Sequence, residues 1–488
     1  MAVDRQTGNG RKRRVLVVVL SAVVSLALLG GYVVADAYDI VPGYLTFREQ
    51  SNDGATIPSA TTALAPAEIV GDIDDSQTVD ATKAKKALSA FLSAEDVGKD
   101  LSVIVADSTG KEIVSEKGTT TREPASTLKT LTALATVEKL DMDSTLDTEV
   151  YLTAADGAKA TIALKGNGDM LLGEGASDAQ HVNGHAGLKT LAESAAKALK
   201  QQGITTVTLQ YDDSLFGTQR MPADMDEKMV SNGNFTPVSS LAIDEGKEWG
   251  SSKKPSDPDA IPTSYPSRTT KPAEETADSF AHQLEKAGIT VDGDASSTTV
   301  SDSILTSDTA RIATVSSAPL WKILRFTLQQ SDNTLAELFG RLVALATNSE
   351  NSPKGATSAI LSIVKADGID VSGIHMSDCS GLSDNSTLTA TTLIEVQERY
   401  YSSAPAEALE GLPVSGFSGT ALGRTFDDSV FGLARLKTGS LDTVTSMTGS
   451  VARKNGGLLF FAVIVNNPDN MWSAHVAVDD FVSALADL

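Results

Sequence analysis

The stretch PASTLK, residues 124–129, places Ser126 and Lys129 three residues apart where a helix is predicted to begin. At this spacing two side chains project from the same face of a helix, so the amine can reach the hydroxyl. A lysine at its usual pKa of about 10.4 is protonated and cannot act as a base, but burial or a second cation lowers that pKa. The pair therefore predicts a serine nucleophile activated by a lysine.

S-x-x-K alone is weak evidence, because the chain contains four further pairs that begin at Ser108, Ser194, Ser251 and Ser362. Those pairs fall in a predicted hairpin turn, in the interior of predicted helices or in a Pro-rich loop. Only Ser126 opens a helix, whose apolar side carries Leu128, Leu131 and Leu134. Taken alone, the pair also fits a helix-capping serine beside a solvated lysine.

Two further motifs favour a catalytic role for Ser126 and Lys129. The only K-T-G lies at 437–439 on a predicted strand, where a glycine admits another backbone and a lysine can bind a carboxylate. Ser331-Asp332-Asn333 lies between two predicted helices, WKILRFTLQQ and TLAELFGRLVALA. A second Ser-Asp-Asn at 383–385 follows a glycine-containing turn without flanking helices and is not assigned to the site.

The elements that must position these motifs come from both ends of the chain. Residues 101–117 alternate around a turn as a hairpin does, and LARLKTGSL, TVTSMTGSVAR and LLFFAVIVNN are three strand candidates before a final helix. We expect all of them to share one antiparallel sheet. Between about Leu164 and Ala310, helices followed by short strands predict an insertion, which includes a Pro-rich loop at 251–272.

Composition narrows the class of protein. The 488 residues carry 63 acidic and 40 basic side chains and a formal net charge of -23, which would repel nucleic acid. Cys379 is the only cysteine, so neither a disulfide within the chain nor a cysteine metal cluster can form. His181 and His185 have the spacing of a helical metal pair, but Asn183-Gly184 between them favours a loop. We therefore predict neither a metal nor a cofactor.

The N-terminus predicts export. Basic residues between Arg5 and Arg14 precede an uncharged run from Val15 to Ala35, long enough as a helix to cross a bilayer core of roughly 30 Å. A cleaved signal peptide is the alternative, since Ala35-Asp36-Ala37 offers a cleavage site. The length of the apolar run favours an uncleaved anchor. Either alternative places the rest of the chain outside the cytoplasm.

The ordered set S-x-x-K, S-x-N and K-T-G is found in β-lactamases and penicillin-binding proteins. This sequence resembles the D-alanyl-D-alanine carboxypeptidase/endopeptidase family, the class C low-molecular-mass penicillin-binding proteins of peptidase family S13. Further blocks of the same order are LKGNGDMLLG, VTLQYDDSLF, SDCSGLSDNS and LPVSGFSGTALGR. One departure is Cys379, where the family has a glycine, so the geometry of that turn is an open question.

The resemblance implies an α+β fold: the transpeptidase fold of penicillin-binding proteins and β-lactamases, with an antiparallel sheet between helices, a helical subdomain and an inserted α/β domain. The catalytic domain is expected at 81–160 and 310–488, and the insertion at 161–309. Before them we expect a basic cytoplasmic tail at 1–14, the membrane anchor or signal peptide at 15–35 and a stalk at 36–80.

The resemblance also implies a role for each motif residue. Ser126 attacks the carbonyl between two D-alanines, and Lys129 takes its proton. Ser331 relays a proton to the leaving amine, and Asn333 holds the peptide or orients Lys129. The implied substrate-binding residues are Lys437, Thr438, Gly439 and Ser440. In this assignment Lys437 and Thr438 bind the terminal carboxylate, and the backbone N–H groups of Ser126 and Ser440 form the oxyanion hole.

The implied activity is that of a serine-type D-alanyl-D-alanine carboxypeptidase that trims peptidoglycan stem peptides. Cleavage of cross-links as an endopeptidase, and acylation by β-lactams, are implied as well. The alternative is a non-catalytic protein that keeps the fold and recognises D-alanyl ends. We expect contact with the membrane through the N-terminal segment only.

Overall fold

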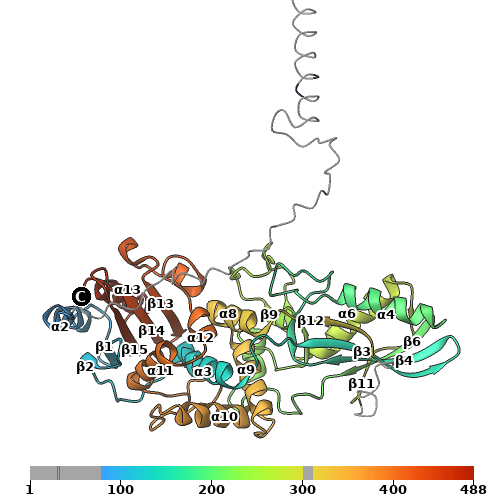
Figure 1. Ribbon diagram of the computed structural model, residues 1–488, viewed down its shortest axis with the longest axis horizontal. Coiled ribbons are helices and arrows are strands. Elements are labelled where there is room, and N and C mark those ends of the chain that lie inside the picture. Colours follow the sequence, from blue (N-terminus) through green and yellow to red (C-terminus); the bar gives the residue numbers. More distant parts are fainter. Residues whose placement is uncertain (1–29, 31, 33–77, 301–310) are drawn as a thin grey trace, which may run out of the picture. The chain divides into compact units, whose positions relative to one another are not determined.

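A computed structural model describes residues 30, 32, 78–300 and 311–488 (Figure 1). The expected tail at 1–14, the expected membrane segment at 15–35 and nearly all of the expected stalk at 36–80 therefore lie outside the described residues, and these assignments stay predictions. Among the residues that are described, no helix is long and apolar enough to span a bilayer.

Strands from both ends of the chain form one five-stranded antiparallel sheet in the order β13-β14-β15-β1-β2. Strand β15 pairs with β1 along its length, from Val465 opposite Leu101 to Leu459 opposite Asp107. The predicted sharing of a sheet between the two ends is confirmed. The bounds are β1 Leu101–Asp107, β2 Glu112–Glu116, β13 Ala434–Leu441, β14 Val444–Ala452 and β15 Leu458–Asn466.

Helices cover both faces of this sheet (Figure 1). Because successive side chains of a strand point to opposite faces, Val103 packs toward α2 (Ala81–Leu92) and α13 (Met471–Leu485), while Ile104 packs toward α3 (Lys129–Lys139) and α11 (Ala390–Ser402). The first pair of helices also touches through the rings of Phe91 and Phe481, whose centroids are 5.2 Å apart. Every residue of β15 is buried, which explains its unbroken apolar run.

A group of helices beside the sheet carries the S-x-x-K and Ser-Asp-Asn motifs. Helix α3 packs against α9 and α10, and α8 leads directly into α9. The bounds are α8 Leu320–Gln330, α9 Asn333–Ala346, α10 Pro353–Ala366 and α12 Ala406–Glu410, with the 3₁₀ helices η1 Ala125–Leu128, η3 Gly419–Gly423 and η4 Asp428–Val430. The face of the sheet that carries Ile104 therefore packs against the helical subdomain, which contains α3, α9 and α10.

The insertion contains a second sheet in the order β10-β6-β4-β3-β12, with β11 also paired to β6. Strand β6 runs parallel to both β4 and β10, and α4 and α6 pack together over the sheet. The predicted units are confirmed, since α4 precedes β6 and α6 precedes β10. The bounds are β3 Asp147–Asp156, β4 Lys159–Gly166, β6 Thr206–Asp212, β10 Thr290–Val291, β11 Ser296–Ser297, β12 Arg311–Ser316, α4 Leu188–Gln201 and α6 Pro272–Lys286.

Short elements complete the insertion. They are β5 Asp169–Leu172, α5 Glu227–Ser231, β7 Leu241–Ile243, η2 Asp244–Gly246, β8 Lys247–Glu248 and β9 Ser267–Arg268. The second sheet also takes β3 and β12 from either side of 161–309, and the described residues from 78 onward belong to one compact unit. The domain boundaries therefore stay a prediction, whereas the mixed α+β class is confirmed.

Candidate active site

Ser126 lies in a sharp turn at the start of a buried helix. The preceding Ala125 has φ +48°, in the left-handed region that non-glycine residues rarely adopt, and such strain is typical of functional sites. The carbonyl of Pro124 accepts a hydrogen bond of 2.6 Å from the Ser446 hydroxyl, which ties the turn to strand β14. Leu128 and Leu131 are fully buried below it. The turn therefore leaves Ser126 partly exposed on a rigid base.

Lys129 is almost fully buried, and its Nζ makes three contacts. The amine lies 2.9 Å from Ser126 Oγ, 2.7 Å from Asn333 Oδ1 and 2.8 Å from the Ser380 carbonyl. The last two oxygens only accept hydrogen bonds, so they take two N–H groups of the amine. In the neutral amine the lone pair is then left for Ser126 Oγ, which is the geometry of a general base.

The surroundings of Lys129 also make the neutral amine accessible. Burial lowers the Lys129 pKa, and the charges of Asp378, Asp332 and Glu337 partly offset this effect, which leaves the pKa at about 8. A lysine with its usual pKa would be protonated almost completely near neutral pH, whereas this lysine has an appreciable neutral fraction.

The Ser-Asp-Asn motif occupies the short turn between α8 and α9, as predicted. Ser331 adopts φ +58°, a left-handed conformation that ends α8, and Asn333 begins α9. The hydroxyl of Ser331 accepts a hydrogen bond of 2.8 Å from Lys437, while Asn333 accepts from Lys129. One turn therefore contacts both of the other motifs.

The K-T-G motif lies on β13, the edge strand of the first sheet. A Cβ at Gly439 would lie 2.2 Å from Ser446 Oγ and 2.9 Å from the Pro124 carbonyl, so only glycine lets this strand approach the turn of Ser126. Ser440, next along the strand, is exposed. An edge strand has backbone groups without a neighbouring strand, and these can bind a ligand.

Lys437 is fully buried, and burial lowers its pKa well below the usual value, with a further contribution from the nearby charge of Lys129. A carboxylate placed beside it would favour the charged ammonium again. The neighbouring Thr438 donates its hydroxyl to Thr420 Oγ1 at 2.7 Å. Lys437 and Thr438 thus supply a cation and a hydroxyl at one end of the site.

All three motifs meet through these contacts. The other S-x-x-K pairs and the second Ser-Asp-Asn make none of these contacts. The Ser194 and Lys197 pair is exposed on α4, and Ser362 donates to a carbonyl within its own helix. In the second Ser-Asp-Asn, the side chains of Ser383 and Asn385 both donate to Asp224. These positions agree with the prediction that the Ser194 and Ser362 pairs and the second Ser-Asp-Asn lie outside the site.

A buried turn that sequence reasoning did not assign to the site supports Lys129. The carboxylate of Asp378 accepts backbone N–H groups from Ser380, Gly381 and Ser383, which fixes the turn so that the Ser380 carbonyl reaches Lys129. The only signal in the sequence was the D-C-S-G-L block around Cys379.

Cys379 fits this turn because α9 makes room for it. Its N–H donates to Glu337 Oε1 at 2.5 Å, and a Cβ on Gly340 would lie only 2.3 Å from its sulfur. Glu337 stands one helical turn after Asn333. Burial and the charge of Asp378 raise the Glu337 pKa to about 8, although the Cys379 N–H and nearby cations act against this rise.

A second buried network that the sequence did not reveal holds the Ser-Asp-Asn turn from the insertion. Arg268 lies 2.7 Å from Glu245, 3.1 Å from Thr334 and 3.3 Å from Asp332. Burial alone would raise the Asp332 pKa, but the Arg268 charge and several hydrogen bonds outweigh it and hold this pKa well below its usual range. Arg268 belongs to the segment 251–272, whose sequence predicts only a Pro-rich loop. Residue spacing in that segment gives no indication of a contact with Asp332.

The two histidines noted in the sequence, His181 and His185, lie in different surroundings. Among the described residues, ligand atoms of His181, Asp257 and Asp259 come within 4.8 Å of one another. His185 instead places its Nδ1 2.9 Å from the His181 carbonyl, and Asp259 already accepts the N–H groups of Val182 and Asn183. These contacts hold two loops together, and we assign no metal to them.

The sheet between helices, the serine and lysine pair, the Ser-x-Asn turn and the K-T-G edge strand together define an acylating serine enzyme of the penicillin-binding class. The model of the D-Ala-D-Ala carboxypeptidase 3 (S13) family matches residues 84–267 and 257–485, and the chain belongs to this family.

Individual relatives cover most of the chain. Carboxypeptidase DacB of Mycolicibacterium smegmatis is 31% identical over 390 residues, which are 78% of this chain and 79% of that protein. A D-alanyl-D-alanine carboxypeptidase of an Actinomadura species is 26% identical over 495 residues, covering 88% and 87%. The crystal structure of penicillin binding protein 4 from Haemophilus influenzae superposes with a TM-score of 0.66 at 19% identity, covering 84% of this chain and all of that one. This structural likeness concerns the fold.

Proposed function

We propose that the protein is a serine-type D-alanyl-D-alanine carboxypeptidase that acts on peptidoglycan stem peptides through an acyl-enzyme on Ser126. The observation that carries the proposal is the position of the Lys129 amine, whose lone pair is left for Ser126 by two carbonyl acceptors. Family membership and the carboxypeptidase names of the relatives support the same activity. Nothing favours the non-catalytic alternative.

Acylation begins when neutral Lys129 takes the proton of Ser126 Oγ. The oxygen attacks the carbonyl carbon between the two D-alanines, and the negative charge that develops on the carbonyl oxygen is stabilised by the N–H groups of Ser126 and Ser440. The bond between carbon and nitrogen then breaks. Ser331 passes a proton to the leaving amine, and its bond to Lys437 gives it a donor from which to replace that proton.

Deacylation uses the same base. Once terminal D-alanine has left, Lys129 passes the proton that it holds to the surroundings and takes another from water, which attacks the acyl carbonyl. The ester bond breaks, Ser126 Oγ recovers a proton, and the shortened peptide leaves. Asn333 holds the Lys129 amine in place during both steps, because its Oδ1 lies 2.7 Å from Nζ.

Substrate selection depends on the terminal carboxylate. We assign its binding to Lys437 and the Thr438 hydroxyl, which lie on edge strand β13 beside the turn of Ser126. A β-lactam carries a carboxylate close to a reactive amide carbonyl, so it can bind to the same groups and acylate Ser126. When the leaving amine belongs to a cross-link instead of free D-alanine, the same steps cut the cross-link as an endopeptidase.

The substrate also bears on location. Peptidoglycan lies outside the cytoplasmic membrane, and the uncharged run at 15–35 after a basic tail supports an exported domain held by an N-terminal anchor. The net charge of -23 would keep such a domain away from anionic lipid, so the anchor is the contact with the membrane that we propose.

The test is covalent labelling by a fluorescent penicillin, followed on a denaturing gel. We expect the wild type to be labelled and Ser126→Ala to remain unlabelled. Ser194→Ala, which alters an S-x-x-K serine on the surface of α4, is the matched control and should be labelled like the wild type. Release of D-alanine from an acyl-D-alanyl-D-alanine peptide then tests turnover. Folded wild type that does neither would refute the proposal.

A further inference from the structure

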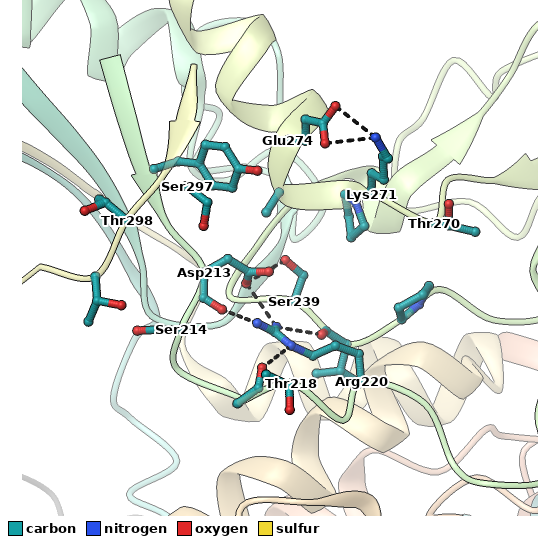
Figure 2. A pocket seen from close by; sticks show the side chains of 17 residues that line it. Asp213, Ser214, Thr218, Arg220, Ser239, Thr270, Lys271, Glu274, Ser297 and Thr298 are labelled. Carbon is teal, nitrogen blue, oxygen red and sulfur yellow. Dashed lines mark hydrogen bonds and ion pairs between the residues drawn. The ribbon is translucent and has the colours of Figure 1, made fainter. Parts of the chain in front are cut away.

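A pocket of about 580 Å³ lies in the insertion, and neither Ser126 nor another motif residue lines it (Figure 2). Its walls come from the end of β6, the loop at 213–220, the segment 237–239, the start of α6 at 270–274 and the residues 297–299 around the end of β11. The steps assigned to the carboxypeptidase reaction use none of these residues. The pocket is therefore a candidate for a separate binding role.

The charged groups of the pocket neutralise one another. Arg220 lies 3.1 Å from Asp213, and Lys271 lies 3.1 Å from Glu274. Figure 2 shows the second pair on one side of the hollow and the first pair on another. Both lysine and arginine side chains that line the pocket are thus paired with a carboxylate. A phosphate or another anion would have to break an ion pair to bind, so the lining favours a neutral ligand.

Apart from the Ser239 hydroxyl, which is bonded to the Leu241 carbonyl at 2.7 Å, the remaining polar side chains of the lining carry hydroxyls that are available for a ligand. The Tyr211 hydroxyl makes no hydrogen bond to another described residue. The same is true of the hydroxyls of Ser214, Thr218, Thr270, Ser297, Thr298 and Thr299. Pro237 and Pro272 add apolar surface to the lining, which also contains the Tyr211 ring. Hydroxyls around an aromatic and apolar surface suit a saccharide, which offers hydroxyl and amide groups together with apolar ring faces.

Two segments connect the pocket to the catalytic centre. The first runs from Asn234, whose carbonyl accepts from the Asn333 side chain at 3.0 Å, to the pocket wall at 237–239. The second runs from Arg268, which contacts Asp332, to the wall at 270–274. A ligand bound in the pocket therefore contacts the same two segments that hold the Ser-Asp-Asn turn.

We propose that this pocket binds the saccharide chain of peptidoglycan, as a subsite that holds the polymer while a stem peptide occupies the site at Ser126. The inference rests on the proposed carboxypeptidase function for the identity of the polymer. It predicts that the pocket contributes to binding of the polymer and leaves the chemical steps at Ser126 unaffected.

The direct test is binding of the full-length chain to glycan strands from which an amidase has removed the stem peptides. Tyr211→Ala removes the aromatic surface, and Ser297→Trp fills the pocket from an exposed position on β11. Both should weaken binding at least three- to tenfold, the scale of one aromatic contact. Thr208→Trp, exposed on β6 outside the lining, and Trp472→Ala, an exposed aromatic residue of α13, are the matched controls and should bind like the wild type.

Kinetics separate this inference from the proposed function. On polymeric peptidoglycan both pocket variants should raise KM with little change in kcat, while turnover of a short acyl-D-alanyl-D-alanine peptide and labelling by penicillin stay at the wild-type level. Wild-type binding of the bare strands in the pocket variants, or an equal loss on both substrates, would overturn the subsite. A wild type that neither turns over the peptide nor reacts with penicillin would instead refute the carboxypeptidase, and the binding assay would still decide whether the pocket holds glycan.

Discussion

The guanidinium of Arg268 lies 3.3 Å from the carboxylate of Asp332, and this contact joins the insertion to the turn that carries Ser331 and Asn333. Both side chains are buried, and Arg268 also contacts Glu245. Asp332 in turn caps α9 through the backbone N–H of Leu335 at 2.8 Å. The insertion therefore helps to build the active site, because it fixes the start of the helix that presents Asn333 to Lys129.

Replacing this cation should destabilise the protein. Arg268→Met leaves Asp332 buried without its main partner and removes one of the two cations beside Glu245, which keeps Lys247 at 2.7 Å. Breaking a buried pair typically costs about 3–5 kcal/mol of unfolding free energy. Lys189→Met is the control, because Lys189 lies 3.9 Å from Glu193 with both side chains more than half exposed, and exposed pairs contribute at most about 1 kcal/mol. Denaturant unfolding measures both. Equal losses in the two variants would contradict the structural role of Arg268.

Lys129 is expected to be essential for acylation. Lys129→Ala removes the general base and should slow penicillin acylation by about 10²- to 10⁴-fold, the usual contribution of such a group. Lys197→Ala changes the equivalent lysine of an exposed S-x-x-K pair on α4 and should react at the wild-type rate. Stopped-flow or quenched labelling gives the rate constants. A Lys129→Ala protein that is folded and reacts normally would exclude Lys129 as the base.

The pH dependence of acylation follows from the same residue. Only the neutral amine accepts a proton, and the Lys129 pKa is lowered to about 8, chiefly by burial. The second-order rate constant of acylation should therefore rise with pH, by up to tenfold per unit below that pKa, and level off above it. The folded fraction is followed by circular dichroism over the same range. A rate that stays flat across this range would show that Lys129 does not limit the reaction as a base.

The sequence predicted those parts of the site in which local spacing and burial decide the structure. Ser126 and Lys129 are three residues apart at the start of a helix, so their contact could be predicted from the sequence. The strand that carries Lys437 has a clear apolar pattern and could be predicted as well. The first sheet was predictable for the same reason, because its strands carry unbroken or alternating apolar runs.

The supports of the site could not be predicted in this way. Arg268 reaches Asp332 across 64 residues of chain, and the Ser380 carbonyl reaches Lys129 across 251. Such contacts depend on how the insertion and the turn at 378–381 fold back, and a Pro-rich segment carries no periodicity that fixes this path. Glu337 was missed because a buried acid on an apolar helix has no distinctive spacing.

Glu337 should make the stability of the protein depend on pH. Burial and the charge of Asp378 raise its pKa from 4.5 to about 8, so the native protein keeps a proton that the unfolded chain releases between these two values. The contribution of this group to the unfolding free energy is complete below pH 4.5 and is lost as pH rises toward about 8. Glu337→Gln keeps an acceptor for the Cys379 N–H but cannot titrate. We therefore expect the stability of the wild type relative to Glu337→Gln to fall with rising pH across this window.

Denaturant unfolding at several pH values measures this difference, and Glu193→Gln, an exposed substitution on α4, controls for the loss of a charge alone. If the wild type and Glu337→Gln kept a constant difference in unfolding free energy, Glu337 would carry the same charge in both states, and the buried acid beside Cys379 would not hold a proton. If the wild type instead became more stable relative to Glu337→Gln as pH rose, the native state would favour the Glu337 carboxylate. Lys129 and Arg341 would then outweigh burial, and the environment of the catalytic lysine would be more negative than the structure indicates.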